Sequence, residues 1–492
     1  MKRNVLAMAV CGCVLTLCGH AAEPFADGRG LFAVAVVPPS VGRCQLSPTF
    51  TRRPPALGVA RTPLPLGMAG VYQIARCVQL DDTTAGFFVN LRQDKTSGID
   101  MEIGTDFCFT RDPKLRKFEG FQPVARAEVV DPAGDGYRFL MVSYPMFPAF
   151  VPLGAKLADG SLHPHAGTGF AVAERLGRPC DANGKCYGKG YVNPLKDKRH
   201  DDVEIVQLAW DGKKLSVTMR ESVGLREFAG EFTQSFDPMS GCVLDGADML
   251  LAWCRALPGE KIARPGVARW RRMGGRWRIA AFTPVGAPGG FEPSLVRDRD
   301  GALLFTYRTG VKEWFGHLFK TTPGATEDTV HARDIRVWRS ADNGATWRLA
   351  LMKENCCNAA PVSIVTAVDG TPLVVTNARA DALATGGKPF HGGIRERLVA
   401  WPLTADKADL LPSLLVRDAN AEFGRAPYGT GWYLDHPCGL VLRLGDRRWH
   451  SVICYRNLDM KEAGGAKPAT EFTGAYVEEI ASGNAAVPVW KF

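Results

Sequence analysis

The feature that most constrains the fold of this chain is a repeated hairpin unit. Each unit has a short apolar run with a period near two, a polar turn and a second apolar run, as at residues 204–221, 293–308, 361–379 and 438–456. Asp211-Gly212, Asp300-Gly301 and Asp369-Gly370 occupy three of the turns. Asp-Gly favours tight hairpin turns because glycine readily adopts positive φ. Helical periodicity is scarce, so the pattern predicts antiparallel β structure.

The spacing of the turns predicts how the hairpins are organised. Asp300 and Asp369 lie roughly 70 residues apart, which fits a four-stranded blade with extended loops. The sequence therefore predicts one all-β domain, a β-propeller, over residues 23–492. Two separate all-β domains are the alternative. Residues 25–200 fit one or two blades or a β-sandwich, so the organisation up to about residue 150 stays open.

Composition agrees with a turn-rich globular fold. The chain has 492 residues, of which 46% are hydrophobic and 23% charged, so it can bury a large core. The net charge of +9 is not gathered in a single-sign run, and no nucleic-acid partner is expected. There is no C-x-x-C pair, and His163 and His165 are separated by a proline, which is more typical of a loop than of a metal site. We expect no metal and no cofactor.

Residues 1–22 have the pattern of a secretory signal peptide. Lys2 and Arg3 precede an apolar run from Val5 to Cys18, and small residues follow. We therefore expect the protein to be secreted or periplasmic. Lipid anchoring at Cys18 is the alternative, and the bulky Leu17 disfavours it. No later run of 18 apolar residues occurs, so no membrane span is expected.

Export makes disulfides possible. Cys438 and Cys454 flank a hairpin turn symmetrically, as do Cys242 and Cys254, and Cys180 and Cys186 could close a short loop. The alternative is that several of these cysteines are buried thiols.

One short motif is more specific than the hairpins. Residues 340–347 read Ser-Ala-Asp-Asn-Gly-Ala-Thr-Trp and fit S-x-D-x-G-x-T-W. In such a turn Asp342 can accept backbone N–H groups, Gly344 can take a positive φ, and Trp347 can pack beneath. The motif resembles the Asp-box of sialidase-like propellers and occurs once in clean form. The resemblance implies a six-bladed propeller and says nothing about activity.

The residues around this motif extend the resemblance over roughly residues 285–460. Phe291-Glu292-Pro293-Ser294 and Thr306-Tyr307-Arg308 look like a middle blade of bacterial sialidases. The resemblance implies that Glu292 polarises a tyrosine nucleophile and that Arg308 binds the substrate carboxylate. The next unit, with Asn377 and then Arg395 and Arg397, resembles the blade that supplies another carboxylate-binding arginine. Arg395 has the better spacing, and Arg397 is the fallback.

The chemistry accounts for these residue types. A sialic acid carries a carboxylate on its anomeric carbon, and arginine forks bind carboxylates with two hydrogen bonds. A neutral tyrosine nucleophile avoids repulsion by the carboxylate of the substrate, which explains why sialidases depart from the two-carboxylate rule of glycosidases.

The sequence departs from the sialidase pattern at three places. Gln73 stands where the first arginine is expected, with Arg76 as a possible substitute. The expected position of the tyrosine falls near His436 or Pro437, and Tyr433 is close but off register. The acid/base aspartate cannot be mapped, and the nearest acidic candidates are Asp100, Asp201 and Asp202.

A second interpretation follows from propeller geometry. The first strand of every blade starts at the central funnel, so residues just before each apolar run should converge there. These are Glu292, Asp435, His436 and Asn358, with Arg308 and Asn377 at strand ends and His163 and His165 as further candidates. Two carboxylates with His and Arg could cleave another glycan by general acid/base catalysis, or bind one without turnover.

We therefore expect a secreted glycoside hydrolase of the exo-sialidase type that cleaves terminal acidic sugars from glycans. The predicted catalytic residues are Glu292, Asp435, His436 and Tyr433, and the predicted substrate-binding residues are Arg308, Arg395 and Asn377. The alternatives are a related propeller with another glycan-cleaving specificity and a non-catalytic glycan-binding propeller.

Overall fold

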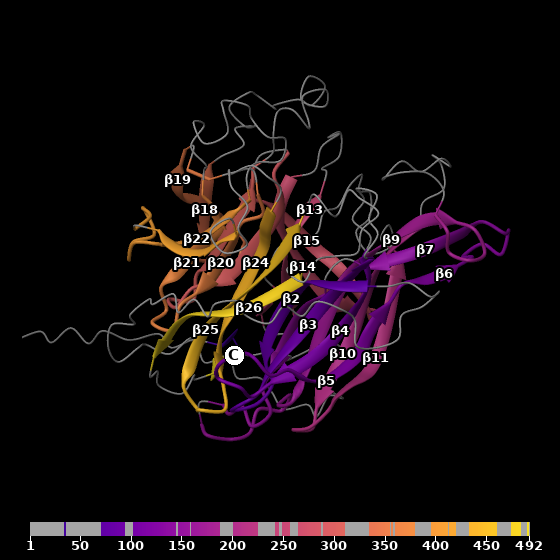
Figure 1. Ribbon diagram of the computed structural model, residues 1–492, viewed down its shortest axis with the longest axis horizontal. Helices are drawn as coiled ribbons and strands as arrows, with labels where there is room; N and C mark the ends of the chain where they lie inside the picture. Colours follow the sequence, from indigo (N-terminus) through magenta and orange to yellow (C-terminus); the bar gives the residue numbers. More distant parts are fainter. Residues whose placement is uncertain are drawn as a thin grey trace, which may run out of the picture.

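The computed structural model describes most of the chain from residue 70 onwards. The described residues are 34–35, 70–93, 102–143, 146–157, 159–186, 200–224, 242–245, 248–255, 264–286, 289–309, 334–354, 356–357, 360–378, 395–411, 413–419, 432–459, 474–483 and 490–491. Their regular elements are all β-strands (Figure 1). Within these residues no helix is long and apolar enough to cross a membrane. The predicted signal peptide at 1–22 lies outside them.

The strands form six consecutive sheets, which we call blades 1 to 6. Blade 1 holds β2 (Gly70–Gln79), β3 (Ala85–Gln93), β4 (Glu102–Thr110) and β5 (Glu119–Arg126). Blade 2 holds β8 (Phe147–Val151), β9 (Thr168–Cys180), β10 (Asp201–Trp210) and β11 (Leu215–Gly224). Blade 3 holds β12 (Cys242–Asp245), β13 (Asp248–Arg255), β14 (Arg264–Met273) and β15 (Arg276–Pro284).

The second half of the chain repeats this plan. Blade 4 holds β16 (Phe291–Arg297), β17 (Leu303–Arg308), β18 (Ile335–Ser340) and β19 (Arg348–Lys353). Blade 5 holds β20 (Ser363–Thr366), β21 (Pro372–Asn377), β22 (Arg397–Pro402) and β23 (Leu414–Asp418). The described part of blade 6 holds β24 (Trp432–Arg443), β25 (Trp449–Asp459) and β26 (Gly474–Gly483). Within each blade, neighbouring strands are antiparallel, as the hairpin pattern predicts.

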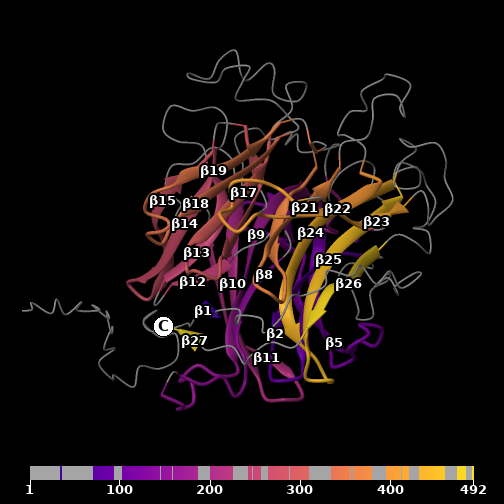
Figure 2. The same ribbon diagram turned by 90° about the vertical axis from the view of Figure 1, so that its left-hand side faces the viewer.

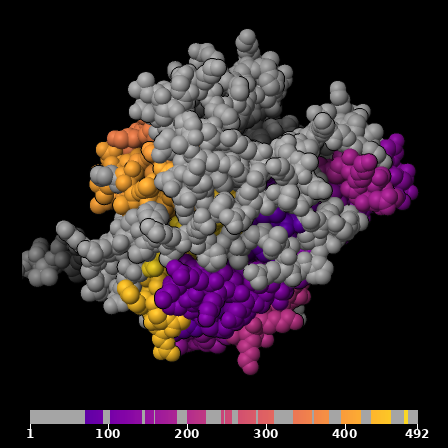
Figure 3. All heavy atoms as spheres, viewed as in Figure 1, coloured from indigo at the N-terminus to yellow at the C-terminus, as the bar shows by residue number. Residues whose placement is uncertain are grey.

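The blades close into a ring. We call the first strand of each blade its inner strand, and each inner strand contacts the neighbouring blades. The ring is closed by β2 of blade 1, which contacts β8 of blade 2 on one side and β24, β25 and β26 of blade 6 on the other (Figure 2). The space-filling view shows blade 1 directly against blade 6 (Figure 3). The predicted six-bladed all-β propeller is thus confirmed. Residues 70–126 form its first blade rather than part of a β-sandwich.

Blade 2 carries an extension. Its second strand, β9, pairs with β8 over its first half and with β7 (Arg138–Ser143) over its second half. A short strand, β6 (Glu128–Val130), pairs with β7, so a hairpin projects from the ring beside blade 2 (Figure 1). Outside the blades, β1 (Val34–Ala35) pairs with β27 (Trp490–Lys491).

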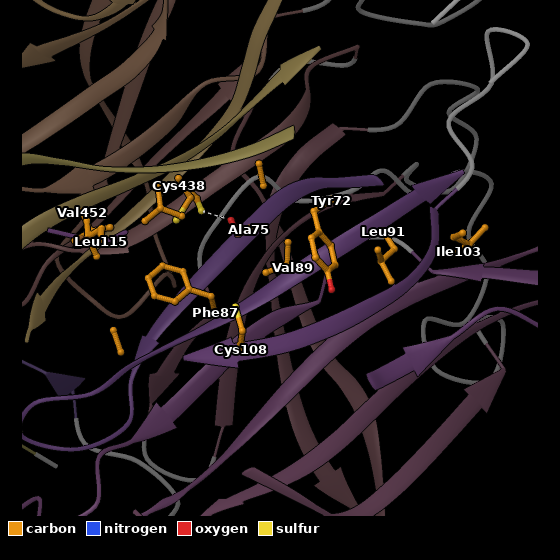
Figure 4. Close-up of a cluster of buried hydrophobic side chains, with 14 of the residues drawn as sticks. Tyr72, Ala75, Phe87, Val89, Leu91, Ile103, Cys108, Leu115, Cys438 and Val452 are labelled. Carbon is orange, nitrogen blue, oxygen red and sulfur yellow. Dashed lines mark hydrogen bonds between the residues drawn. The ribbon is translucent and has the colours of Figure 1, made fainter. Parts of the chain in front are cut away.

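Apolar side chains fill the spaces between adjacent blades. Between blades 2 and 3, Phe170 packs edge-on against Trp277 with ring centroids 5.5 Å apart, and both are fully buried. Between blades 6 and 1, buried side chains of β2, β3 and β4 meet those of β24 and β25 (Figure 4). Burial of apolar area at about 25 cal/mol per Å² makes this stacking the main stabilising contribution.

The S-x-D-x-G-x-T-W segment forms the turn between β18 and β19. Asp342 Oδ1 accepts hydrogen bonds from Ser340 Oγ at 2.7 Å and from the Thr346 backbone N–H at 2.9 Å. Gly344 has φ +84°, and Trp347 Nε1 donates to its carbonyl at 3.1 Å. Ser340 lies opposite Leu303, the first residue of β17, so the turn is at the end of blade 4 away from Arg308.

No disulfide bond joins any of the described cysteines. Cys438 lies directly opposite Cys454, and Cys180 opposite Cys186, as their spacing predicts. Cys242 lies opposite Leu251 instead of Cys254. The predicted pairing of Cys242 with Cys254 is wrong. The hairpin turn lies between Asp245 and Asp248, whereas Cys242 could lie opposite Cys254 only if the turn were centred on residue 248.

Candidate active site at the mouth of the propeller

Polar side chains gather where the inner strands begin and the second strands end, a face that we call the mouth. Phe291 at the start of β16 pairs with Arg308 at the end of β17. Asp435 near the start of β24 pairs with Arg456 near the end of β25. The blades repeat one topology around a ring, so equivalent positions in different blades meet at this face. The structure therefore brings together the predicted residues of blades 4, 5 and 6.

Two predicted residues sit in matching backbone distortions. Glu292 and His436 each precede a proline, adopt φ of 49° and 53°, and lie where the register of the inner strand shifts. A non-glycine residue in this region costs about 1–3 kcal/mol, and such strain clusters at functional sites. In blade 1 the register shifts at Gln73. Gln73, Glu292 and His436 thus occupy equivalent bulges in blades 1, 4 and 6.

Asp435 is the centre of the cluster and is fully buried. It accepts hydrogen bonds from Arg456 Nε at 2.7 Å and Nη2 at 3.0 Å, and from Arg395 Nη1 at 2.5 Å. Burial alone would raise the pKa of Asp435, but Arg456, His436 and Arg395 more than offset this and hold the pKa well below its usual range. Asp435 is therefore ionised at neutral pH, and it orients the groups around it.

His436 forms a dyad with Asp435. Its Nδ1 lies 2.8 Å from Asp435 Oδ1. Burial and Arg456 lower the pKa of His436, and the opposing effects of Asp435 and Glu292 do not fully compensate. The imidazole is therefore neutral at pH 7. A neutral ring that donates Nδ1–H to a carboxylate keeps its basic lone pair on Nε2, which is the arrangement of a general base.

Glu292 and Arg308 form the second ion pair of the mouth. Arg308 Nη1 donates to Glu292 Oε2 at 2.8 Å, and the guanidinium lies 4.5 Å from the centre of the Phe291 ring. Burial lowers the pKa of Arg308, as does Arg395, while Glu292 and Asp435 oppose this change. The Glu292 side chain is 15% exposed whereas that of Asp435 is fully buried, so Glu292 is the carboxylate that substrate could reach.

Blade 5 contributes Arg395 and Asn377. Arg395 lies over the Tyr433 ring at 4.6 Å, whereas Arg397 points outward to Asp418 at 2.8 Å, so only Arg395 joins the cluster. Asn377 is buried, and its Nδ2 donates to the Leu434 carbonyl at 2.9 Å. It therefore ties blade 5 to β24, which is a positioning role, whereas the sequence predicted direct substrate binding. Tyr433 is half-buried beside Arg395.

The sequence prediction missed Arg456 and Arg92. Each donates to Gln73 Oε1 at 3.4 Å. Gln73 therefore occupies the place of the expected arginine, and arginines from two neighbouring strands surround it. Arg76 does not substitute, because it points at Phe147 and Cys438. Arg456 could have been found, since it closes the second strand of unit 438–456 as Arg308 closes that of unit 293–308.

The remaining candidates include one residue on the mouth side of blade 2, Asp202, which pairs with Arg175 near the end of β9. His163 and His165 precede β9 at the end of blade 2 opposite the mouth, and burial together with His165 lowers the pKa of His163 to about 4. Asp202 is paired with Arg175 at 3.7 Å and accepts a hydrogen bond from Ser222. Asn358 and Asp100 lie outside the described residues. No cluster of His, Cys, Asp or Glu among the described residues could hold a metal ion.

No family model and no curated protein matches the chain. Among solved structures, a K499G mutant of the NanB sialidase from Streptococcus pneumoniae is 10% identical with a TM-score of 0.47, over 87% of this chain and 70% of that one. A protein of unknown function from Dyadobacter fermentans is 12% identical with a TM-score of 0.42, over 86% and 98%. A Penicillium chrysogenum α-L-arabinanase is 9% identical with a TM-score of 0.39, over 86% and 98%. Similarities this low say nothing about the reaction.

Proposed function

We propose that the mouth of the propeller is the active site of a glycoside hydrolase that cleaves a terminal acidic sugar, with an α-sialoside as the first substrate class to test. The observation that carries this proposal is the convergence of Arg308, Arg395 and Arg456 around Glu292 and Asp435, next to the Asp435–His436 dyad. Localisation outside the cytoplasm, from the signal-peptide pattern, is part of the same proposal.

The arginines supply the affinity for an acidic sugar. Three guanidinium groups, of Arg308, Arg395 and Arg456, concentrate positive charge at the mouth beside the carboxylates of Glu292 and Asp435. A carboxylate of the substrate would satisfy that charge through the two-point hydrogen bonding that arginine provides. Because these groups are buried, the attraction is less screened by salt than it would be on the surface.

The remaining side chains have roles that fit hydrolysis. Asp435 orients His436, and Nε2 of His436 takes a proton from the attacking water. Glu292, in its ion pair with Arg308, stabilises the positive charge that develops at the anomeric carbon. Tyr433, held beside Arg395, is the candidate donor of a proton to the leaving oxygen. In this scheme His436 replaces the tyrosine that the sialidase resemblance implies at the same bulge.

One observation favours a second candidate reaction. A nitrogen base stands where a sialidase-like site would have its nucleophile, and arginines are close by. The same groups could remove the proton α to the carboxylate of a uronic acid and eliminate the glycosidic oxygen. Arginine pairing with the carboxylate would make that proton more acidic. The product would contain a new carbon–carbon double bond, whereas hydrolysis would not.

The test compares one protein on both substrate classes. The purified chain would be assayed with fluorogenic α-sialosides, with other acidic glycosides, and with uronate polysaccharides followed by ultraviolet absorbance of the double bond. His436→Ala, Glu292→Gln and Arg308→Ala should each lower kcat/KM at least a hundredfold. Arg397→Ala, an outward-facing arginine of the same blade, is the matched control and should leave kcat/KM within twofold.

The outcomes separate the candidates. Release of the fluorophore from the sialoside supports hydrolysis, and double-bond formation supports elimination. Folded protein that turns over neither class but binds acidic sugars, with binding lost in Arg308→Ala, would replace the enzyme by a glycan-binding propeller. Activity that survives all three substitutions would place the reaction elsewhere in the molecule.

A further inference from the structure

Three thiols meet where the ring closes. Cys77 lies on β2 of blade 1, and Cys438 and Cys454 lie on β24 and β25 of blade 6. The Cys454 thiol is hydrogen-bonded to both of the others, and the Cys438 thiol donates a hydrogen bond to the Ala75 carbonyl at 2.9 Å (Figure 4). Cys438 and Cys454 are buried within the apolar cluster between the two blades. This thiol cluster has no part in the reaction proposed above.

The strand register places two of these thiols in position for a covalent bond. Cys438 and Cys454 are direct partners in the antiparallel pair of β24 and β25. Residues directly opposite each other in such a pair have Cα atoms about 4.5–5.5 Å apart. Disulfides join cysteines whose Cα atoms are about 4.4–6.8 Å apart. A bond between them therefore requires no movement of the strands.

The third element of the cluster is Arg76. It is 3% exposed, and its Nη1 donates to Cys438 Sγ at 3.6 Å and to the Ala75 carbonyl at 3.1 Å. Its Nε and Nη2 have no hydrogen-bond partner among the described residues. The guanidinium packs 5.2 Å from the centre of the Phe147 ring. A buried guanidinium needs a counter-charge, and the sulfur of Cys438 is the group placed to provide one.

The charge state of Cys438 responds to this neighbour. Burial alone would raise the pKa of the Cys438 thiol. The hydrogen bond with the Cys454 thiol and the positive charge of Arg76 outweigh this effect and lower the pKa to about 7. Hydrogen bonds with Cys438 and Cys77, together with burial, keep the pKa of Cys454 well above its usual range. Cys438 is therefore the nucleophile of the pair, and Cys454 is the thiol that resolves a mixed disulfide.

We propose that Cys438 and Cys454 form a reversible disulfide by exchange with a small-molecule disulfide such as glutathione disulfide. Cys438 is buried, so the exchange takes place when the seam between blades 6 and 1 opens locally; the Cys438 thiolate then attacks one sulfur of the oxidant and expels one glutathione thiolate. Cys454 then loses its proton, attacks the Cys438 sulfur of the mixed disulfide and expels the second glutathione. Two protein thiols are oxidised, and one glutathione disulfide is reduced to two glutathione molecules.

Arg76 makes this bond reversible. The reduced form keeps the ion pair between Arg76 and the Cys438 thiolate, whereas the disulfide leaves the buried guanidinium without a counter-charge. Stabilising the reduced form makes a disulfide more easily reduced. The structure therefore assigns Arg76 the role of setting the redox equilibrium. Replacing Arg76 by an apolar residue should favour the disulfide.

The experiment equilibrates the full chain at pH 8 in glutathione buffers of graded oxidised-to-reduced ratio. Samples are quenched with acid, alkylated and digested, and linked peptides are identified by mass spectrometry. We expect a Cys438–Cys454 peptide whose yield follows the ratio. The Cys77→Ala variant should still form this linkage. Folded Arg76→Met protein should form it with an equilibrium constant at least tenfold larger, and Arg76→Lys should stay near the wild type.

Other outcomes would overturn the proposal. A Cys77–Cys454 linkage would show that the wrong pair was assigned, and three free thiols in the most oxidising buffer would exclude the bond. An unchanged equilibrium constant in Arg76→Met would remove the role of Arg76. If that variant does not fold, the alkylation rate of Cys438 in the wild type decides instead. Half-maximal rate near pH 7 supports the thiolate, and a rate that rises only with ordinary thiol ionisation contradicts it.

Discussion

Asp435 and Arg456 lie directly opposite each other on β24 and β25 and form a two-point ion pair at the mouth of the propeller. The pair is buried, and the same carboxylate also receives Arg395 from blade 5 and His436 from its own strand. One residue therefore sets the orientation of two arginines and one candidate base. The consequences can be measured separately for stability and for activity.

Asp435→Asn should destabilise the fold by about 3–5 kcal/mol, because it leaves two buried guanidinium groups without their carboxylate. Urea denaturation at pH 7 measures this loss. Asp418→Asn is the control, since its partner Arg397 is half-exposed, and it should cost about 0–1 kcal/mol. Equal losses in the two variants would contradict the central role of Asp435.

The pH dependence of the free energy of unfolding should reveal the ionisation of Asp435. The pKa of Asp435 is lower in the folded state than in the unfolded state, so its contribution is fully present above the unfolded value of about 3.9. That contribution is lost as pH falls through the lower folded value. Wild-type stability should therefore drop more steeply below pH 4 than that of Asp435→Asn. Parallel curves for the two proteins would refute this assignment.

Activity should follow the neutral form of His436. Burial and Arg456 lower the pKa of this imidazole below its ordinary value of about 6.5. The logarithm of kcat/KM should therefore rise with pH along a limb centred below pH 6.5 and then level off. The pH profile of kcat/KM on the active substrate measures this limb. A limb centred above pH 7 would exclude neutral His436 as the base.

The contribution of His450 to stability should have the opposite pH dependence to that of Asp435. Its Nδ1 lies 3.0 Å from Glu479 and its Nε2 3.0 Å from Asp446. Burial would lower the pKa of His450, but the two carboxylates outweigh this effect and raise it. Its contribution is present below the unfolded value and is lost as pH rises through the folded one. His450→Gln should cost about 1–3 kcal/mol at pH 5.5 and less at pH 9. A larger loss at pH 9 would contradict the ion pairs.

Gly344→Ala should lower the free energy of unfolding by about 1–3 kcal/mol, because Gly344 has φ +84°, where an alanine is strained. Backbone strain should account for the whole loss, since an added Cβ would meet only ordinary contacts at 3.6 Å. Thermal unfolding measures the loss. Gly301→Ala, at φ +88° with open space around it, is the matched control and should cost the same. Activity should be unchanged in both variants, since these turns lie at the end of blade 4 away from the mouth.

The sequence predicted the local parts of this molecule. Alternating apolar residues and Asp-Gly turns encode hairpins, because strand pairing within a hairpin involves residues close along the chain. Glu292 and Arg308 were found in this way, since they close one such hairpin and their contact spans only 16 residues. Asp435 and His436 were found as residues at the start of an inner strand. Their predicted catalytic roles remain predictions.

The tertiary structure decided which side chains meet between blades. Arg395 reaches Asp435 across 40 residues, Arg456 reaches Gln73 across 383, and Arg76 reaches Cys438 across 362. No periodicity in the sequence encodes such contacts, because they arise only when apolar packing brings blade 5 against blade 6 and closes blade 6 on blade 1. The choice of Arg395 over Arg397 and the support that Asn377 gives to β24 depend on the packing of blade 5 against blade 6, whereas the meeting of three thiols depends on ring closure. The sequence by itself thus determined the blades and several residues of the mouth, while packing between blades determined which side chains meet there.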